Sequence, residues 1–444
     1  MFSHRVLWGV LGMLFIFPAA GSAADSNALV LTLDDAVARA VEYSINLQKN
    51  RLTLEDREYS SKRLWAEIFP AISASADMSY RNTPFFTGTD VDREFTEQKL
   101  NYSTSAGISL SLTAGIPYRM KLLTLAYQQQ LLSYEEARRL LEIATAQSFY
   151  TLIADKENLT QLVETQALAE RQLEKNRISR ANGFISEVVV LQSQLAVETA
   201  KYNLSTAQAD YANQLGVFLT SLGLERQTQV ALTGEFSIRQ IEEDPERLIR
   251  EYLPTRPDIQ QQRQTIEQLG LTEKRTVMDA RSPSLRFSFN WGSGATQSFD
   301  KPFADTVSGT AALSIPINPW IPGTKEAQPL RSAKSDIERA LLDLKNTEDT
   351  AAAQIRSLTA GLRNSWESLE IARLREQIAQ RSYELTERGF LAGAVESLTL
   401  EDSLNSLASA RYQLLRSELN YQNMVLDLAR AINVDWRQFL RSVP

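Results

Sequence analysis

The chain contains an internal repeat that spans most of its length. Residues 200–204 (AKYNL) align with residues 410–414 (ARYQL) at an offset of 410 − 200 = 210. The same offset relates three pairs of identical residues: Gly183 and Gly393, Tyr211 and Tyr421, and Asn213 and Asn423. Between Pro70 and Pro283 the offset is 283 − 70 = 213, so it changes little along the chain. A near-constant spacing of this kind indicates one structural unit that folds twice.

Four short segments alternate between apolar and small polar residues. The first, residues 71–81, places Ser or Asp between the apolar side chains of Ile72, Ala74, Ala76, Met78 and Tyr80. The others cover residues 101–113, 284–291 and 307–315, and the third carries Phe287, Phe289 and Trp291 on its apolar side. A period of two puts successive side chains on opposite faces of a strand. Each copy of the unit is therefore predicted to contribute two strands with one apolar face.

Long helices flank the first pair of strands. The pattern predicts an amphipathic helix from Leu33 to Phe69, with Thr32 or Asp34 as its N-cap and Pro70 at its end. Residues 118–182 contain neither Gly nor Pro. A helix of that length, on the order of 100 Å, suits a coiled coil better than a compact domain. A turn at residues 183–186 then opens a second helix to about residue 222, which predicts an antiparallel helical hairpin.

The second copy has the same layout. A helix is predicted from Asp258 to about Arg281, before the second pair of strands, whose connecting loop covers residues 292–305. A long helix follows from about residue 330 to 388, with a turn at 389–394 and a last helix to about Phe439. The unit is thus helix, strand, strand, helix, helix in both copies.

The N-terminus has the layout of an export signal. His4 and Arg5 precede the apolar run 6–17, and small residues 19–24 follow it. The run is shorter than the ~20 residues that a membrane-spanning helix needs. The predicted parts of the chain are a signal peptide (1–23), a first repeat (24–222), a polar connector or equatorial segment (223–256), a second repeat (257–436) and a C-terminal tail (437–444).

The composition argues against catalysis and against nucleic-acid binding. The chain has no cysteine, and its single histidine, His4, lies in the predicted leader. A mature chain without His or Cys lacks the commonest general base, the usual zinc ligands and the usual nucleophile pairs, so neither a metal nor a cofactor is expected. A secreted hydrolase would need a clustered acid pair, and the sequence offers no such pair. The formal net charge of −7 disfavours a nucleic-acid partner.

The length of the strands points to a membrane. About ten residues is what a tilted strand needs to cross a bilayer, although a water-soluble sheet would alternate in the same way. The export signal and the aromatic residues near the strand ends favour the membrane. Lipid offers backbone N–H and C=O groups no hydrogen-bond partner, so all of them must pair within the protein and the sheet must close. Such barrels have at least ~8 strands. Because one chain supplies four, several copies are predicted to share one barrel in a symmetric ring.

Several motifs, in a fixed order, carry a resemblance to a known family. They are LTLDDAV at residues 31–37, Phe69-Pro70, the turn 183–186, VLQSQ at 190–194, Arg256-Pro257-Asp258, and the segment 393–403. On these motifs the chain resembles the TolC family of outer-membrane efflux proteins over essentially its whole mature length. Each motif is weak alone, and their order, spacing and duplication together make the resemblance specific.

The resemblance implies a mainly α fold with a membrane β-barrel portion. Three chains would share a single 12-stranded barrel (3 × 4 = 12), continued by a long α-helical barrel and a mixed α/β belt built from the connector and the chain ends. It implies the exit duct of a tripartite efflux or type I secretion system, in the outer membrane with a large periplasmic portion. The implied partners are a homotrimer's other copies, a periplasmic adaptor (membrane fusion) protein, an inner-membrane transporter of the RND or ABC type, and outer-membrane lipid.

The resemblance also places a gate at the periplasmic helix tips, where the family commonly sets acidic residues in three-fold rings. The matching position is Asp402, and Thr399 stands where a second acid is often found; Glu401 and Glu396 are further candidates. Three carboxylates around one axis would repel each other and favour cations. On the alternative interpretation, Asp402 and Glu401 are ordinary solvated helix residues.

Two further sets of residues are predicted to make contacts. The candidates for adaptor contact at the tips are Gly183, Ser186, Leu191, Ser193 and Gly393. The candidates for lipid contact are Ile72, Ala74, Ala76, Met78, Tyr80, Phe287, Phe289 and Trp291. Two alternatives to the duct remain at this point, namely a structural coiled-coil protein of the envelope without a pore, and a secreted hydrolase.

Overall fold

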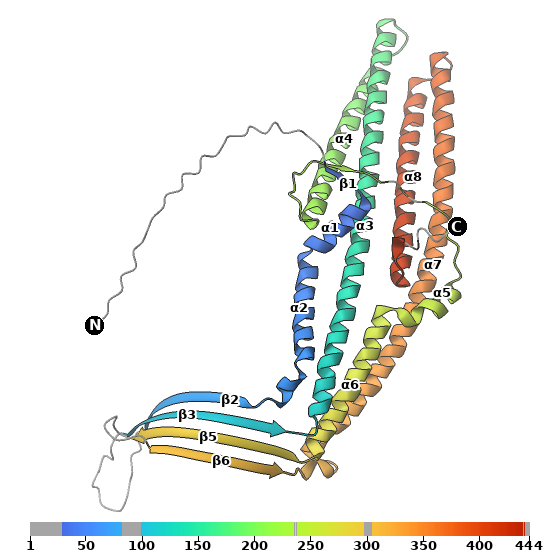
Figure 1. Cartoon of the computed structure of the whole chain (residues 1–444). Helices are drawn as coiled ribbons and strands as arrows, with labels where there is room; N and C mark the ends of the chain where they lie inside the picture. The colour runs from blue at the N-terminus through green and yellow to red at the C-terminus, as the bar shows by residue number, and fades with distance from the viewer. Residues whose placement is uncertain are drawn as a thin grey trace, which may run out of the picture.

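The structure is an elongated molecule with a sheet at one end and two helical hairpins that end at the other (Figure 1). The computed structural model describes residues 29–81, 99–234, 236, 238–296, 304–437 and 439. The predicted signal peptide (1–23), most of the predicted loop at 83–99 and the tail beyond residue 439 lie outside this part of the chain. None of the described helices combines the length and the apolar character that a membrane crossing needs.

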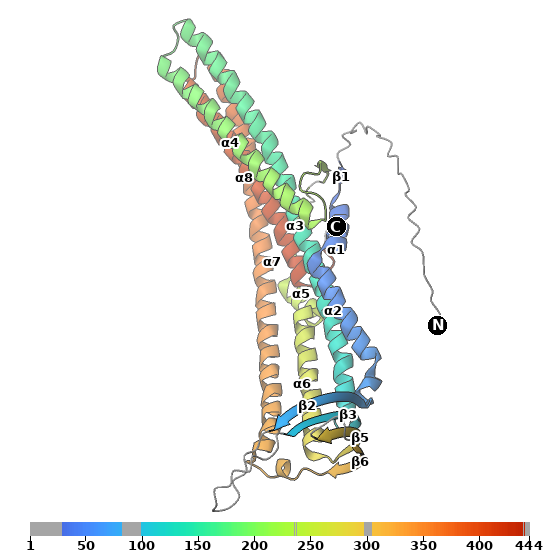
Figure 2. The ribbon, with the colours of Figure 1, turned by 90° about the vertical axis from the view of Figure 1, so that its left-hand side faces the viewer.

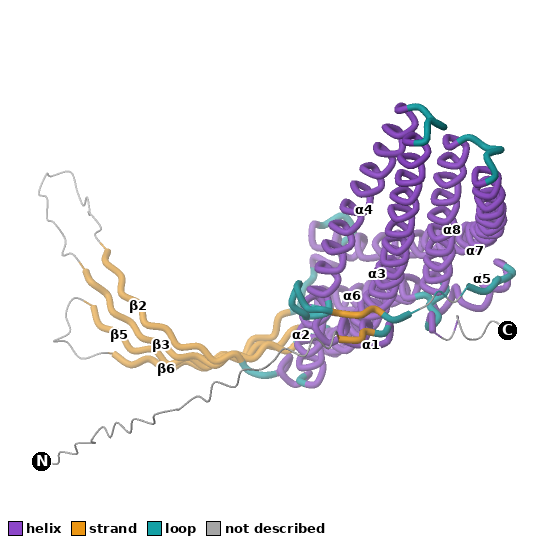
Figure 3. The backbone as a smooth tube through the Cα atoms, turned by 90° about the horizontal axis from the view of Figure 1, so that it is seen from above, coloured by secondary structure: helices purple, strands orange, loops and turns teal. Residues whose placement is uncertain are grey.

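The sheet is antiparallel and has the strand order β2, β3, β5, β6. Its strands are β2 (Ala71–Arg81), β3 (Lys99–Leu112), β5 (Ser284–Thr296) and β6 (Ala304–Ser314). The two repeats therefore meet in the centre of the sheet, where β3 pairs with β5. β5 is longer than the predicted strand 284–291, because residues 292–296 also pair with β3 although they do not alternate. Figure 3 shows the strands running out to one side of the helices.

The register brings the apolar sides of the four strands onto one face. Residues directly opposite each other in a sheet share a face. One such row is Ala74, Ala106, Trp291 and Val307, and the next is Ile72, Ile108, Phe289 and Gly309. The other face carries rows of small polar residues, such as Ser109, Ser288 and Thr310. The alternations seen in the sequence are thus in phase across the whole sheet.

Two long hairpins rise from the sheet. The first joins α3 (Ile116–Ala181) to α4 (Glu187–Ser221), and the second joins α7 (Gln328–Leu391) to α8 (Ser397–Ala431). The ends of α3 and α7 differ by 391 − 181 = 210 residues. The starts of α4 and α8 differ by 397 − 187 = 210 and their ends by 431 − 221 = 210. The predicted pair of helix-strand-strand-helix-helix repeats is confirmed.

The half of the molecule nearer the sheet contains a different set of helices. Here α2 (Ile45–Lys62) and α6 (Pro257–Arg281) pack with the lower parts of α3 and α7 (Figure 2). The helices contact one another in the order α2, α3, α6, α7, which continues the strand order of the sheet. The two short 3₁₀ helices η3 (Asn318–Trp320) and η4 (Lys325–Ala327) connect β6 to α7.

The repeat extends to individual backbone conformations. Gly183 and Gly393 both have left-handed backbones, with φ of 79° and 72°. At the far ends of α4 and α8, Gly223 has φ of 71° and its repeat partner Asn433 has φ of 57°. Gly and Asn are the residues that best tolerate this region, which ends a helix by turning the chain. The hydrogen bonds match as well, since Leu224 N donates to Leu219 O and Val434 N donates to Ala429 O.

Two predicted helices are shorter in the structure. The helix predicted from Leu33 to Phe69 is divided into α1 (Leu33–Tyr43), α2 and a 3₁₀ turn, η1 (Leu64–Ile68). Ser44 causes the first break, because its extended backbone ends α1 while its side chain accepts a hydrogen bond from Leu47 N and caps α2. Thr32 is the N-cap of α1, as predicted, in a capping box with Asp35. The last helix ends at Ala431 rather than Phe439, because Asn433 turns the chain.

The connector folds against the middle of the helices and encloses the main core. Its strand β4 (Val230–Leu232) pairs in parallel with β1 (Leu29–Leu31), and α5 (Pro245–Tyr252) and η2 (Leu253–Thr255) follow. Tyr421 of α8 fastens the connector, because its hydroxyl donates to Arg239 O at 2.6 Å and accepts from Ile241 N at 3.1 Å. The buried cluster around Tyr421 joins α1, α3, α5, α7 and α8. The connector therefore contacts helices of both repeats.

A comparison of glycines tests this construction. A Cβ at Gly223 would lie 2.5 Å from Cγ of Tyr43 and on a left-handed backbone, whereas a Cβ at Gly270 inside α6 would meet nothing within 4 Å. We expect Gly223→Ala to lower the free energy of unfolding by at least about 1 kcal/mol and Gly270→Ala to raise it by about 0.5–1 kcal/mol. Chemical unfolding in mild detergent, followed by circular dichroism, measures both. Equal effects would contradict the packing described for Gly223.

Candidate functional site

The tip of the first hairpin is an exposed turn with apolar side chains. Gly183 N donates to Arg180 O at 2.8 Å and Phe184 N donates to Ser179 O at 2.9 Å, which closes the turn. Gly183, Ser186 and Leu191 are exposed, as predicted residues of a contact surface must be. Phe184 is 80% exposed and was not among the predicted contact residues. Its position in a Gly-containing turn was the signal that could have identified it.

Ser193 lies inside the first hairpin, unlike the other predicted tip residues. Its side chain is only 3% exposed, and its hydroxyl accepts a hydrogen bond from Asn176 Nδ2 at 2.6 Å. The hydroxyl also donates to Val189 O at 3.0 Å. The two buried side chains join α3 to α4 near the tip, so Ser193 has a structural contact within the chain.

The tip of the second hairpin has the same turn but more acidic residues. Gly393 N donates to Phe390 O at 3.0 Å and Ala394 N donates to Gly389 O at 2.9 Å. Gly389 belongs to α7 rather than to the turn, and Val395 packs against it. Glu396, Thr399 and Asp402 are exposed. No ion pair joins Glu396 or Asp402 to a cation among the described residues.

Glu401 points in a different direction from Asp402. It lines a groove of about 410 Å³ between the two hairpins, together with Tyr383 and Leu404 on one side and Ser193 and Leu195 on the other. Burial, and secondarily the neighbouring charge of Asp402, raises the pKa of Glu401. The structure thus separates the predicted gate residues, with Glu401 between the hairpins and the other three on the surface.

The predicted lipid-contact residues gather on one face of the sheet. Ile72, Met78, Tyr80, Phe287, Phe289 and Trp291 are all exposed, and the register places them on the same side as Ala74 and Ala76. The charged groups on the opposite face are Asp77 and Arg286 among the residues whose side chains are described. The face is therefore broad and uncovered in the single chain, and it is apolar from its helical end to the row of Ala74 and Trp291. The next row, that of Ala76, is more polar, because it contains Thr104, Ser293 and Asp305.

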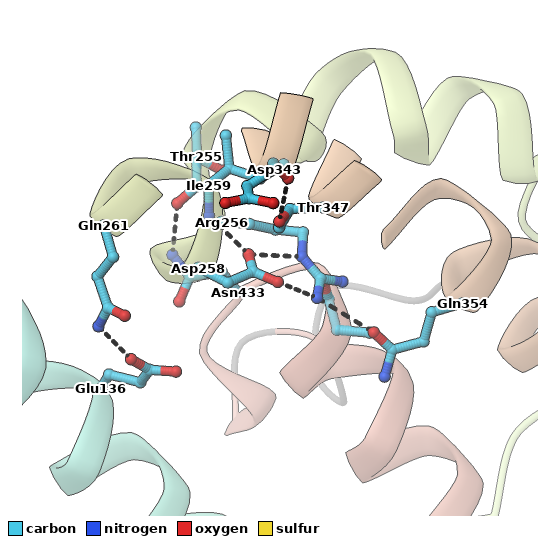
Figure 4. Close-up of polar contacts among 11 residues, drawn as sticks. Glu136, Thr255, Arg256, Asp258, Ile259, Gln261, Asp343, Thr347, Gln354 and Asn433 are labelled. Atoms are coloured by element: carbon cyan, nitrogen blue, oxygen red, sulfur yellow. Dashed lines mark hydrogen bonds and ion pairs between the residues drawn. The ribbon is translucent and has the colours of Figure 1, made fainter. Parts of the chain in front are cut away.

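A buried arginine fixes the joint between the two halves of the molecule. Arg256 precedes α6, and its Nη1 donates to Ala431 O, a carbonyl at the C-terminal end of α8, at 2.8 Å. Its Nε and Nη2 form a two-pronged contact with Asp258 at 3.1 and 2.7 Å, and Nη2 also reaches Gln354 of α7 at 3.1 Å (Figure 4). Burial alone would raise the pKa of Asp258, but the contacts with Arg256 outweigh burial and hold it below its usual value.

The Arg256-Pro257-Asp258 motif therefore has a structural role that the sequence did not reveal. Pro257 stands in the first turn of α6, where its missing N–H costs nothing. Arg256 satisfies a helix-end carbonyl that would otherwise be unpaired in a buried place. Nearby, Asn433 Nδ2 donates to Thr255 O at 3.0 Å, and Asn433 accepts from Arg139. The motif joins α6, α7 and α8 at the level where α8 ends and α6 begins.

Comparisons with known proteins agree with this geometry. Residues 248–434 match the sequence model of the family described as outer membrane efflux protein. The toluene efflux pump outer membrane protein TtgC of Pseudomonas putida is 28% identical over 380 residues, which cover 84% of this chain and 76% of that protein.

Solved structures show the same fold at low sequence identity. The outer membrane channel CmeC of Campylobacter jejuni superposes with a TM-score of 0.72 at 17% identity, over 92% of this chain and 88% of CmeC. CusC superposes with a TM-score of 0.71 at 14% identity, over 92% of this chain and 94% of CusC. The hairpins and the sheet thus have the fold of these outer-membrane channels. Residues 248–434 match the outer membrane efflux protein family, and most of the chain is similar to efflux-pump outer membrane proteins. These similarities support a role in transport and a place in the outer membrane with a large periplasmic part.

The joint at Arg256 can be tested by substitution. We expect Arg256→Met to lower the free energy of unfolding by about 2–4 kcal/mol, because it removes the cationic partner of Asp258 and the side-chain donor to the carbonyl of Ala431. Arg263→Met is the matched control on α6, since the ion pair of Arg263 with Glu348 is solvent-exposed and is expected to contribute below about 1 kcal/mol. Chemical unfolding measures both variants, and equal losses would contradict the role of the joint.

The pH dependence of the same joint has a defined sign. Because the pKa of Asp258 is lowered in the folded state, its ionised form contributes stability above its unfolded pKa of about 3.9, and that contribution is lost as the pH falls. Asp258→Asn should therefore destabilise the protein at pH 7 and destabilise it less below about pH 4. A constant difference across this range would show that Asp258 is not held ionised by Arg256.

Proposed function

We propose that three copies of the chain form a passive exit duct of an efflux pump, with one shared barrel in the outer membrane. The observation that supports this proposal is the sheet of four strands. Its mainly apolar face is uncovered, and its edges, β2 and β6, have no partner in the described chain. A spanning sheet needs closure and at least ~8 strands. Three chains in a ring supply 12 strands (3 × 4 = 12) and pair each β6 with the β2 of a neighbour.

The faces of the sheet support an open duct. With Ile72, Ala74, Ala76, Met78, Tyr80, Phe287, Phe289 and Trp291 toward lipid, the opposite face lines the interior with Ser, Thr and Gly. These side chains are small, so they leave space within the barrel. The helices next to the sheet are arranged in the same order as the strands. In the proposed trimer, the interior of the barrel would therefore continue between the helices toward the hairpin tips.

The hairpin tips supply the periplasmic end of the proposed duct. Asp402, with Glu396 and Thr399, is exposed near the second tip and forms the proposed gate, where three-fold symmetry would gather the acids around one axis. Glu401 lies in the groove between the hairpins, so we assign it to hairpin packing. Asp402 as an ordinary solvated residue is the alternative that the experiment below distinguishes.

The same tips supply the proposed contact with a periplasmic adaptor protein. The exposed residues Gly183, Ser186, Leu191 and Gly393 form this surface, and we add Phe184. Ser193 is left out because it is buried. An inner-membrane transporter of the RND or ABC type would provide the energy. The relatives are named as efflux pump proteins, which favours an efflux pump over a type I secretion system for this chain.

Conductance tests the duct and the gate together. The purified full-length protein in planar bilayers should conduct ions as a trimer, and Asp402→Ala should raise the conductance or weaken block by divalent cations. Asp56→Ala, which removes an exposed acid on α2, is the control and should leave both unchanged. A protein that is extracted without detergent and does not conduct would favour the non-pore coiled-coil alternative. Conductance that Asp402→Ala leaves unchanged would remove Asp402 from the gate.

The orientation of the sheet has its own test. Ala76 and Ser75 are neighbours on opposite faces of β2, and both are exposed in the single chain. We expect Ala76→Asp to block assembly in the membrane, because a charge facing lipid costs on the order of 2 kcal/mol or more. Ser75→Asp should assemble normally, since it faces the interior. The amount of SDS-resistant trimer in outer-membrane fractions measures both, and the opposite result would reverse the faces.

A further inference from the structure

Two exposed apolar clusters lie at the two edges of the sheet, both at its helical end. The first, which we call the β2-side cluster, consists of Trp65, Ile68 and Phe69, immediately before β2. The second, the β6-side cluster, follows β6 and consists of Ile315, Ile317, Trp320 and Ile321. All seven side chains are exposed in the single chain, so no part of the described chain covers either cluster.

The β2-side cluster is an ordered surface. Trp65 and Phe69 pack edge to face, with ring centroids 5.4 Å apart and an angle of 78°. The 3₁₀ turn η1 that carries Trp65 is held by α3 and β3 on its inner side. Trp65 nevertheless remains 55% exposed. The outward side of η1 therefore presents a preformed aromatic pair to whatever lies beyond the edge of the sheet.

The β6-side cluster is also held in shape by its own hydrogen bonds. Trp320 N donates to Ile317 O at 3.0 Å, and Thr324 Oγ1 donates to Asn318 O at 2.8 Å. The guanidinium carbon of Arg281 lies 5.1 Å from the centre of the Trp320 ring, and Trp320 is 60% exposed. The backbone of this turn is thus satisfied internally, while its apolar side chains point outward.

The connection that carries the β6-side cluster is longer than the corresponding connection in the first repeat. Residues 113–115 suffice to join β3 to α3, whereas residues 315–327 join β6 to α7. β3 lies inside the sheet and β6 at its edge. Of these two connections, the longer one is therefore the one that borders the outside of the chain. This is where an added segment can reach a neighbour.

We propose that the β6-side cluster packs against the β2-side cluster of the neighbouring copy and closes the ring at the junction of sheet and helices. The inference rests on the proposed function, in which β6 pairs with a neighbour's β2. β6 runs toward the helices and β2 runs away from them, so such a pair is antiparallel. The end of β6 and the start of the neighbour's β2 then lie at the same end, which brings the two clusters together at each of three equivalent contacts.

A neighbouring copy fits these clusters better than lipid does. A lipid-binding girdle would surround the base of the whole sheet, because lipid meets every strand. The connections at the two central strands are Thr113, Ala114 and Gly115 after β3, and Ser282 and Pro283 before β5, and they carry no large apolar side chain. Among the four connections between strands and helices, large apolar side chains are exposed only in those at the two edges, where chains meet.

Cysteine cross-linking tests the contact, because the natural chain contains no cysteine. The variant carries Phe69→Cys and Ile317→Cys together and is oxidised in outer-membrane fractions. Within one chain these positions lie at opposite edges of a four-stranded sheet, about 14 Å apart at ~4.8 Å per strand, which is too far for a disulfide. The samples are heated in SDS to dissociate any non-covalent trimer, and the expected product is a covalent trimer that a reducing agent returns to monomer. Each single variant is a control and should give no covalent trimer after heating.

A second pair series separates failure of this inference from failure of the shared barrel. Ser75→Cys is combined in turn with Ser308→Cys and with Thr310→Cys, which places cysteines on the interior face of the two edge strands. Cross-linking of a strand pair without cross-linking of Phe69→Cys with Ile317→Cys would overturn the cluster contact and leave the shared barrel standing. Failure of all pairs would overturn both.

The energetic coupling provides an independent readout. Trp65→Ala and Trp320→Ala should each lower the temperature at which the SDS-resistant trimer dissociates, and the double variant should lower it by less than the sum, because both remove the same contact. Trp291→Ala, an exposed aromatic on the apolar face of β5, is the control for loss of a Trp. Additive effects, or labelling of Ile317→Cys by a lipid-soluble maleimide, would overturn the contact in favour of lipid.

Discussion

The unpaired edges of a four-stranded sheet are the constraint on which the rest of the structure depends. In lipid, a backbone N–H or C=O without a partner costs several kcal/mol, so β2 and β6 cannot remain edges there. The helices next to these two edge strands in the chain also have uncovered apolar surfaces. α2 exposes Ile45, Leu52 and Tyr59 at a spacing of seven residues, and α7 exposes Leu341 and Leu342. Apolar side chains on both helical edges are what a ring of copies would bury, so strands and helices impose the same requirement on assembly.

The sequence predicted the features that depend on local chemistry. The alternation of apolar and polar residues predicted the strands and their common apolar face, because successive side chains of a strand point to opposite faces of the sheet. The offset of 210 predicted that the two hairpins have the same layout. A residue with a left-handed backbone is needed to turn the chain after each long helix, so such residues recur at this offset. That need explains why Gly183 recurs as Gly393 and why Gly223 recurs as Asn433, the other residue type that tolerates the conformation. Identical residues were not required, only residues with the same backbone freedom.

The sequence could not predict which side of each long helix meets which neighbour. α3 contacts α1, α2, α4, α6 and α8 along its length, so no single apolar stripe describes it. For this reason Ser193 was taken for a surface residue although it is buried against Asn176, and Glu401 was grouped with Asp402 although it lies in the groove between the hairpins. The break at Ser44 and the joint at Arg256 escaped prediction for a related cause, because each depends on a polar contact with a helix end rather than on periodicity.

Duplication followed by divergence accounts for the difference between the two tips. At the offset of 210, Leu191 corresponds to Glu401 and Gln192 corresponds to Asp402, so the first tip is neutral or apolar where the second is acidic. The acid that the first tip does carry, Glu187, is paired with Arg180 at 2.9 Å, and the residue at the position of Arg180 in the second tip is Phe390. An exposed leucine with a neutralised charge suits an apolar contact with a partner protein. In the described part of the chain, the exposed carboxylates Glu396 and Asp402 of the second tip have no cationic partner, which suits the proposed place where like charges from several copies converge and attract cations. The two copies of one repeated unit thus differ in chemistry at the same end of the molecule, as the proposed adaptor contact and the proposed gate would require.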